Sequence, residues 1–231
     1  MHSYGRLQVR TDDLSPARWL IRSRTEDGFG TVAGVSAPGF DAYARVLHPA
    51  ALDERPVPWA EVAAAYGKPL TALSNWHELI GMGRDYVNAQ QYGLPGVWDE
   101  HPVEGPTPPA LARQLMPVLA RHTAAADRCW FGVWHGYGTW DFTGVPVFKT
   151  PGRDEVLLSG PLADADSPEA LHASGWVELP DLWWPDDRAW CLGGDVDLVS
   201  TYIGGTEALI ADLLETRGLE AFKVCADDRV G

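Results

Sequence analysis

Residues 182–197 read LWWPDDRAWCLGGDVD, and they hold three tryptophans, four aspartates and one arginine. This stretch predicts an apolar segment, a turn at Pro185-Asp186-Asp187 and a strand from about Ala189 to Leu198. Because strand side chains alternate between two faces, the strand should bury an apolar face and present an acidic one. The apolar set is Trp190, Leu192, Val196 and Leu198, and the acidic set is Asp195 and Asp197. The apolar face fits a core, and the acidic face fits solvent, a cation or a partner.

Length and composition indicate one loop-rich globular domain. The chain has 231 residues, of which 45% are hydrophobic, so a sizeable core can form. Eleven tryptophans supply large apolar surfaces, while 24 glycines and 18 prolines indicate many turns and long connections. The first thirteen residues lack the apolar region of a secretory signal, and no run approaches the roughly 18 apolar residues of a membrane helix. We therefore expect a soluble, cytoplasmic protein.

The charge balance is acidic, with a formal net charge of -14. Nucleic acids and anionic membranes attract Lys/Arg patches, so neither is an expected partner. An unknown protein or a small molecule is expected instead, and the acidity favours a basic one. The ordinary explanation of the acidity is solubility. The three cysteines, Cys129, Cys191 and Cys225, form no Cys-x-x-Cys pair, so they predict reduced thiols rather than a zinc or redox site.

Patterning along the chain predicts alternating helices and strands. Strands are expected at 7–10, 31–35, 40–47, 129–134, 145–148, 155–159 and 219–224, with strand or turn at 198–203. Helices are expected from Ser15-Pro16, over 59–66, around Trp76, over 107–126 with a bend at Pro117, from Ser167-Pro168 to Gly175, and from Thr206 to Gly218. In the last helix Leu209, Ile210, Leu213 and Leu214 should face inward. Residues 81–109 predict a long surface loop.

These elements indicate a single α+β domain over 1–231, with a mostly antiparallel sheet, flanking helices and long Gly/Pro-rich loops. One core should contain the residues with the longest apolar faces. They are Trp130, Phe131, Trp134, Trp190, Leu192, Leu209, Ile210 and Leu213.

Three segments resemble a family of uncharacterised proteins from high-GC bacteria. They are YARVLHPA at 43–50, DRCWF at 127–131 and WWPDDRAWC at 183–191. The resemblance spans most of the chain and implies no activity, because no role is established for that family. In acidity and size alone, the chain is also similar to α+β immunity proteins of bacterial toxin systems.

The candidate binding residues fall in two segments. His135, Tyr137 and Trp140 belong to a Gly-rich aromatic stretch that could form a shallow pocket, although a tight turn is the commoner structure for such glycines. Trp183 and Trp184 are neighbours on a strand and point opposite ways, so one of them could be an exposed binding anchor. The remaining candidates are Asp186, Asp187, Asp195 and Asp197, which could ligate a hard cation but more often cap turns.

No motif names a reaction. The aspartate spacing matches no calcium loop, and the chain has neither a Gly-x-Ser-x-Gly nor a phosphate-binding Gly-rich loop, so no metal and no cofactor are expected. The leading hypothesis is a binding or protein-interaction module. The alternatives are a small hydrolase-type enzyme with Asp/His residues in an aromatic-lined pocket, and an immunity-like protein that neutralises a basic toxin. Whether the chain is an enzyme stays open at this point.

Overall fold

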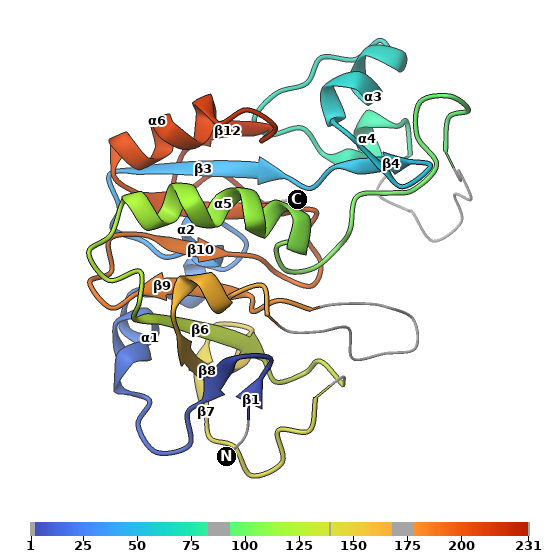
Figure 1. Ribbon diagram of the computed structural model, residues 1–231. Helices are drawn as coiled ribbons and strands as arrows, with labels where there is room; N and C mark the ends of the chain where they lie inside the picture. The colour runs from blue at the N-terminus through green and yellow to red at the C-terminus, as the bar shows by residue number, and fades with distance from the viewer. Residues whose placement is uncertain (1–2, 83–92, 139, 168–177, 231) are drawn as a thin grey trace.

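A ten-stranded sheet organises the computed structural model of the protein, which describes residues 3–82, 93–138, 140–167 and 178–230 (Figure 1). The strand order is β1-β2-β8-β6-β9-β10-β11-β3-β12, β7 pairs with β8, and all of these pairings are antiparallel. The strands are β1 (Ser3–Tyr4), β2 (Leu7–Val9), β3 (Ala42–Leu47), β6 (Cys129–Trp134), β7 (Val147–Thr150), β8 (Arg153–Gly160), β9 (Leu182–Pro185), β10 (Cys191–Gly193), β11 (Ser200–Gly205) and β12 (Ala221–Val224). The predicted α+β class with an antiparallel sheet is confirmed.

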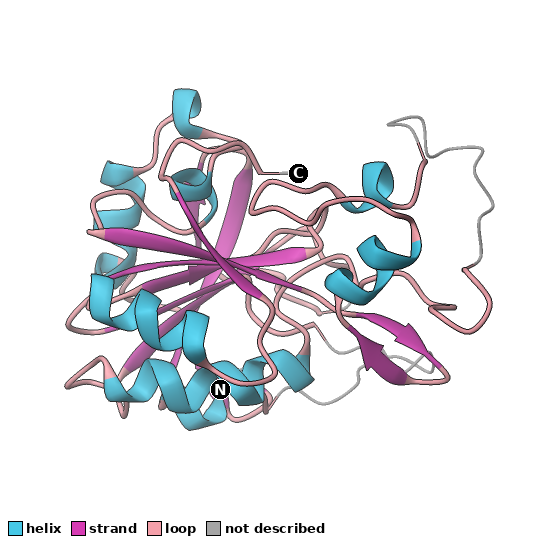
Figure 2. Cartoon of the chain, turned by 90° about the horizontal axis from the view of Figure 1, so that it is seen from above, coloured by secondary structure: helices cyan, strands magenta, loops and turns pink. Residues whose placement is uncertain are grey.

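Helices cover both faces of the sheet (Figure 2). On one face lie α5 (Pro109–Arg121) and α6 (Glu207–Glu215), which pack on the largest hydrophobic cluster, here called the α5/α6 cluster. On the other face lie α1 (Arg18–Ser23) and α2 (Val32–Val35). Each packs on a separate hydrophobic cluster, called the α1 cluster and the α2 cluster. In the part of the chain that the structure describes, no helix is long and apolar enough to cross a membrane.

Strand β9 occupies the middle of the sheet, between β6 and β10, so both of its faces are covered. Trp183 packs in the α5/α6 cluster and Trp184 in the α1 cluster, with exposures of 0% and 1%. The alternation predicted for the two tryptophans is therefore confirmed, but the predicted exposure of one of them is wrong. A central strand between two helical layers leaves neither side chain in solvent.

The predicted core needs one change. Six of its eight residues, namely Phe131, Trp190, Leu192, Leu209, Ile210 and Leu213, lie in the α5/α6 cluster, and Trp134 packs against it. Trp130 packs instead against the α1 cluster, because it alternates with Phe131 along β6. Leu214 was expected to face inward, but it is 39% exposed since it lies on the outer side of α6.

Three other elements differ from the predictions, one in type and two in their bounds. Residues 31–35 form a short helix, α2, because the Thr31 hydroxyl caps its first turn by accepting from Gly34 N–H. The strand expected at 189–198 ends at Gly193, and Leu198 joins the α2 cluster rather than the face of Trp190. Helix α5 contains Pro117 as predicted but ends at Arg121, five residues before the predicted end. Of the helix expected from Ser167 to Gly175, residues 168–175 lie outside the described residues.

A smaller unit with its own core extends beyond the end of β3 (Figure 1). It contains the hairpin of β4 (Ala50–Leu52) and β5 (Arg55–Val57), with α3 (Trp59–Ala65) and α4 (Trp76–Leu79). Buried His48 holds the 93–108 segment to the sheet, because its ring nitrogens lie 2.8 Å from Val103 O and 2.9 Å from Thr201 Oγ1.

Candidate functional site

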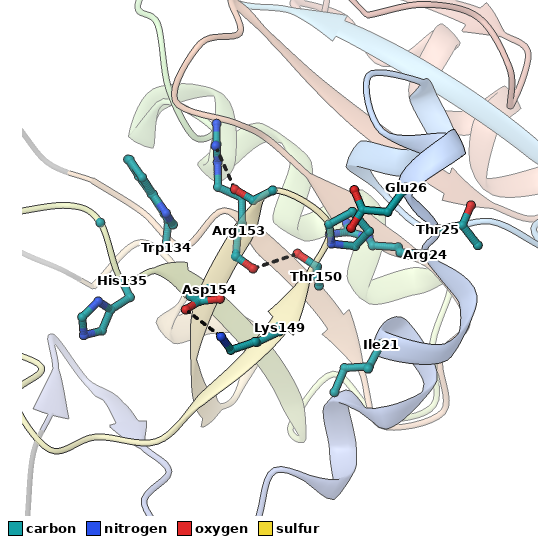
Figure 3. Close-up of a pocket in the computed structure, with 13 residues that line it drawn as sticks. Ile21, Arg24, Thr25, Glu26, Trp134, His135, Lys149, Thr150, Arg153 and Asp154 are labelled. Carbon is teal, nitrogen blue, oxygen red and sulfur yellow. Dashed lines mark hydrogen bonds and ion pairs between the residues drawn. The ribbon is translucent and has the colours of Figure 1, made fainter.

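A cleft of about 800 Å³ opens beside the end of the sheet where β6 ends and β8 begins. Three segments form its walls: residues 21–26 of α1 and the turn after it, residues 134–136 after β6, and residues 149–154 of the β7–β8 hairpin. In Figure 3, Trp134 and His135 lie on one side, and Arg24 and Glu26 on the other. The cleft is large enough for a small organic ligand.

A smaller inner cavity of about 180 Å³ adjoins this cleft. Arg24, Thr150, Pro151 and Arg153 line both spaces, so these residues separate the open cleft from the inner cavity. The inner cavity adds three acids, Glu155, Asp195 and Asp197, to its wall. Charged side chains of both signs therefore converge on one small volume.

Arg153, the first residue of β8, is the centre of this arrangement. Its Nη2 donates to Asp195 Oδ1 at 2.6 Å and contacts Asp197 Oδ2 at 3.4 Å. The guanidinium also lies over the Trp134 ring, 4.8 Å from its centroid. The Arg153 and Asp195 side chains are only 20% and 18% exposed, so water screens this ion pair less than one on the open surface.

Glu155, two residues further along β8, is 2% exposed. Its Oε2 has no hydrogen-bond partner among the described residues. Gly132 makes room for this carboxyl group, since a Cβ there would lie 3.3 Å from Oε2 and 3.2 Å from Phe148 Cζ. Burial, followed by the negative charge of Asp181, raises the pKa of Glu155 well above its usual range. The Glu155 carboxyl group therefore holds its proton more strongly than an exposed glutamate does.

Asp181 precedes β9 and is 4% exposed. Its Oδ1 accepts from the Tyr137 hydroxyl at 2.7 Å, and its Oδ2 accepts from Trp134 N–H at 2.8 Å. Burial raises the pKa of Asp181 to about 7, although these two hydrogen bonds act in the opposite direction. Asp181 thus fixes the chain from Trp134 to Tyr137 and holds the cleft wall in place.

Arg24 follows α1 and reaches across to the end of α2. Its Nη2 donates to the carbonyl oxygens of Val35 and Ser36, while its Nε is buried without a hydrogen-bond partner in the described parts of the chain. Arg24 and Glu155 both line the inner cavity and form no ion pair with each other at 4 Å or less. Each leaves a polar atom unsatisfied.

The structure brings some of the predicted site residues together and separates others. His135 lines the cleft, and Asp195 lines the inner cavity. Tyr137 is buried, and its hydroxyl donates inward to Asp181, so it is not available to a ligand in the cleft as the prediction had it. Trp140 packs on Tyr4 with ring centroids 4.2 Å apart and lines neither space.

The predicted aspartates contact their own chain. Asp186 Oδ1 accepts from Trp130 Nε1 at 3.0 Å. Asp187 accepts from the Thr123 hydroxyl at 2.8 Å and from Ala124 N–H at 2.9 Å, and it caps the turn at Ala189. Burial raises and these hydrogen bonds lower the pKa of Asp187, and the hydrogen bonds prevail. Among the residues that the structure describes, no group of three or more His, Cys, Asp or Glu side chains could hold a metal ion.

Sequence reasoning missed Arg24, Arg153, Glu155 and Asp181. One signal was available for Glu155: it opens a strand segment, Glu155 to Leu158, whose other members are apolar, so its side chain enters a covered face. The other three carry no local signal, because their environment depends on which strands are neighbours. Comparison with known proteins gives no match, whether to protein-family models, to curated proteins or to solved structures.

Proposed function

We propose that this chain is a cytoplasmic protein that binds a small polar molecule in the cleft and its inner cavity. The observation that carries the proposal is the pair of unsatisfied polar atoms, Glu155 Oε2 and Arg24 Nε, on residues that line the same cavity. A buried polar atom left without a partner costs about 1–3 kcal/mol. A site that keeps two such atoms bears this cost, and a ligand group with a donor and an acceptor can offset it.

The wall of the cleft supports the same function. The Arg153 guanidinium is held in place between Asp195 and the Trp134 ring, so it is preorganised to bind an acceptor group. His135 and Lys149 add further polar groups. A concave, mixed polar and apolar site of this size is typical of small-molecule binding rather than of a flat protein interface.

The experiment is a thermal-shift screen of small polar molecules, followed by titration calorimetry of the compounds that raise the melting temperature. Arg153→Ala and Glu155→Leu should each weaken such compounds at least tenfold. Arg113→Ala is the matched control, because Arg113 also forms an Arg–Asp pair, with Asp166 at 2.9 Å, away from the cleft. If the compounds bind equally to the two cleft variants and to the control, the cleft is not the binding site.

A second candidate function is acid catalysis of a hydrolysis in the same cleft. The observation that favours it is Glu155, a buried carboxyl group with a raised pKa that lines the same cavity as the Arg153–Asp195 ion pair. A carboxyl group with a raised pKa can act as the general acid that protonates a leaving group. Chromogenic ester and glycoside substrates test this, since any turnover should disappear in Glu155→Gln. Turnover that survives in this variant would exclude Glu155 as the acid.

Recognition of a basic toxin, as in an immunity-like protein, remains a further prediction. The four aspartates of the 182–197 segment all contact groups of their own chain. The Asp197 side chain is 83% exposed and so remains open to a partner.

A further inference from the structure

A second cavity, of about 530 Å³, lies over α1 and is lined by positive charge. Its lining residues are Ser15, Arg18, Trp19, Arg22, Ser23 and Arg188. Three are arginines and none is acidic, although the whole chain carries a net charge of -14. This is a local reversal of the overall charge, and it lies apart from the cleft described above.

The three arginines form no ion pair of 4 Å or less among the described residues. Two acids near them in sequence are engaged elsewhere. Asp13 accepts from Ser15, from the backbone N–H at 2.8 Å and from the hydroxyl at 2.9 Å. Asp187, next to Arg188, accepts from the Thr123 hydroxyl at 2.8 Å and from Ala124 N–H at 2.9 Å. The guanidinium groups therefore keep their hydrogen-bond donors available to an anion from outside the chain.

Two separate segments supply these arginines. Arg18 and Arg22 are four residues apart on α1, so they lie on one side of the helix. Arg188 comes from the turn between β9 and β10, and its guanidinium lies 5.6 Å from the centroid of the Trp19 ring. Like charges at this helical spacing repel, so folding alone does not explain their convergence.

The backbone of Arg188 gives an independent indication of function. Its φ is +56°, in the left-handed region that glycine occupies at low cost and arginine does not. The residue closes the turn, since Arg188 N–H donates to Pro185 O at 2.9 Å. This backbone conformation directs the Arg188 guanidinium over the Trp19 ring. Residues held in unfavourable backbone conformations are concentrated at functional sites.

We propose that this cavity binds a phosphate group, either free or as a monoester, through Arg18, Arg22 and Arg188. Guanidinium groups bind phosphate oxygens in a two-pronged geometry, and three of them match the oxygens of one dianion. The Trp19 ring, which is partly buried, forms an apolar wall for the organic part of a monoester. This site is independent of the proposed function of the cleft.

The test is calorimetric titration with inorganic phosphate, AMP and adenosine, with sodium chloride at equal ionic strength as the reference. We expect saturable binding of phosphate or AMP, no binding of adenosine, and a loss of affinity of at least tenfold in Arg22→Gln and Arg188→Gly. Arg217→Gln is the control, because Arg217 is also exposed and without an ion pair among the described residues, but follows α6 on the other side of the sheet.

Arg188→Gly separates binding from folding. Glycine suits the left-handed backbone, so the ligand-free variant should melt at the wild-type temperature or above it. Binding of AMP alone would identify a monoester as the ligand, and binding of phosphate alone would identify the free ion. A response no greater than that to sodium chloride, an unchanged affinity in Arg188→Gly, or an equal loss in Arg217→Gln would each overturn the proposal.

Discussion

At the scale of single residues, Glu155 should make stability fall as pH rises. Its pKa is raised in the folded protein, so the folded state holds a proton that the unfolded state releases above about pH 4.5. The stabilisation is complete below that pH and declines as pH increases. Glu155→Gln removes the titrating group. The free energy of unfolding of the variant, relative to that of the wild type, should therefore rise from pH 5 to pH 8. Urea denaturation at both pH values measures this, and an equal difference at both would contradict the raised pKa.

His48 should have the opposite effect. Burial, opposed only in part by the contact with Val103 O, lowers the pKa of His48 from 6.5 to about 4. Between these pKa values the unfolded state binds a proton that the folded state does not bind. The contribution of neutral His48 to the free energy of unfolding is therefore complete above about pH 6.5 and is lost as pH falls towards 4. The loss is on the order of 3 kcal/mol. His48→Gln should show a correspondingly weaker dependence over this range, whereas parallel curves would place the titration elsewhere.

At the scale of elements, α6 allows a test with two adjacent leucines. Leu213 is fully buried against the sheet, whereas Leu214 is 39% exposed. Leu213→Ala should therefore lower the free energy of unfolding by about 2–5 kcal/mol, because it leaves a cavity, and Leu214→Ala by less than about 1 kcal/mol. Denaturant titration of both variants gives the comparison. Equal losses would mean that the helix is rotated relative to the sheet.

Elements with strong local signals could be predicted from the sequence, but which elements pack against one another could not. Strand β6 has the predicted bounds, and α6 begins after the Thr206 cap, whose hydroxyl accepts from Leu209 N–H at 3.2 Å. Residues 31–35 read as a strand because their apolar run has the length of one, and the cap by Thr31 decided otherwise. Periodicity describes one element at a time, so it cannot say that β9 is covered on both faces.

At the scale of the whole molecule, the candidate site escaped prediction because its parts are distant in sequence. Arg153 and Asp195 meet through the strand order β8-β6-β9-β10, in which β8 and β6, and β6 and β9, are neighbours without being successive in the chain. Arg24 joins them from the segment after α1. Patterning along the chain predicted the fold class, and the short apolar runs predicted the lack of a membrane-spanning helix in the described residues, since both are local properties of the sequence. Which charged side chains meet depends on the strand order, which local patterns do not contain.

Despite the acidic composition, we expect the protein to bind no metal ion tightly. Asp187 accepts several hydrogen bonds, and Asp195 and Asp197 contact Arg153, so the carboxylates that could gather around a cation are already engaged. We expect less than one equivalent of metal in elemental analysis of the purified protein, and a melting curve that EDTA leaves unchanged. A melting temperature lowered by several degrees in EDTA would show a bound ion.

The small unit beyond the end of β3 should have its own signal in circular dichroism. Its core holds three indoles in contact, with ring centroids 5.1 Å apart for the tilted pair Trp59 and Trp76 and 5.3 Å apart for the edge-on pair Trp76 and Trp98. Chromophores this close couple, so this unit should contribute a paired positive and negative band to the circular dichroism spectrum, whereas backbone ellipticity reports mainly on the sheet and the longer helices. Heating the protein while following both signals would show whether the unit melts with the sheet or before it.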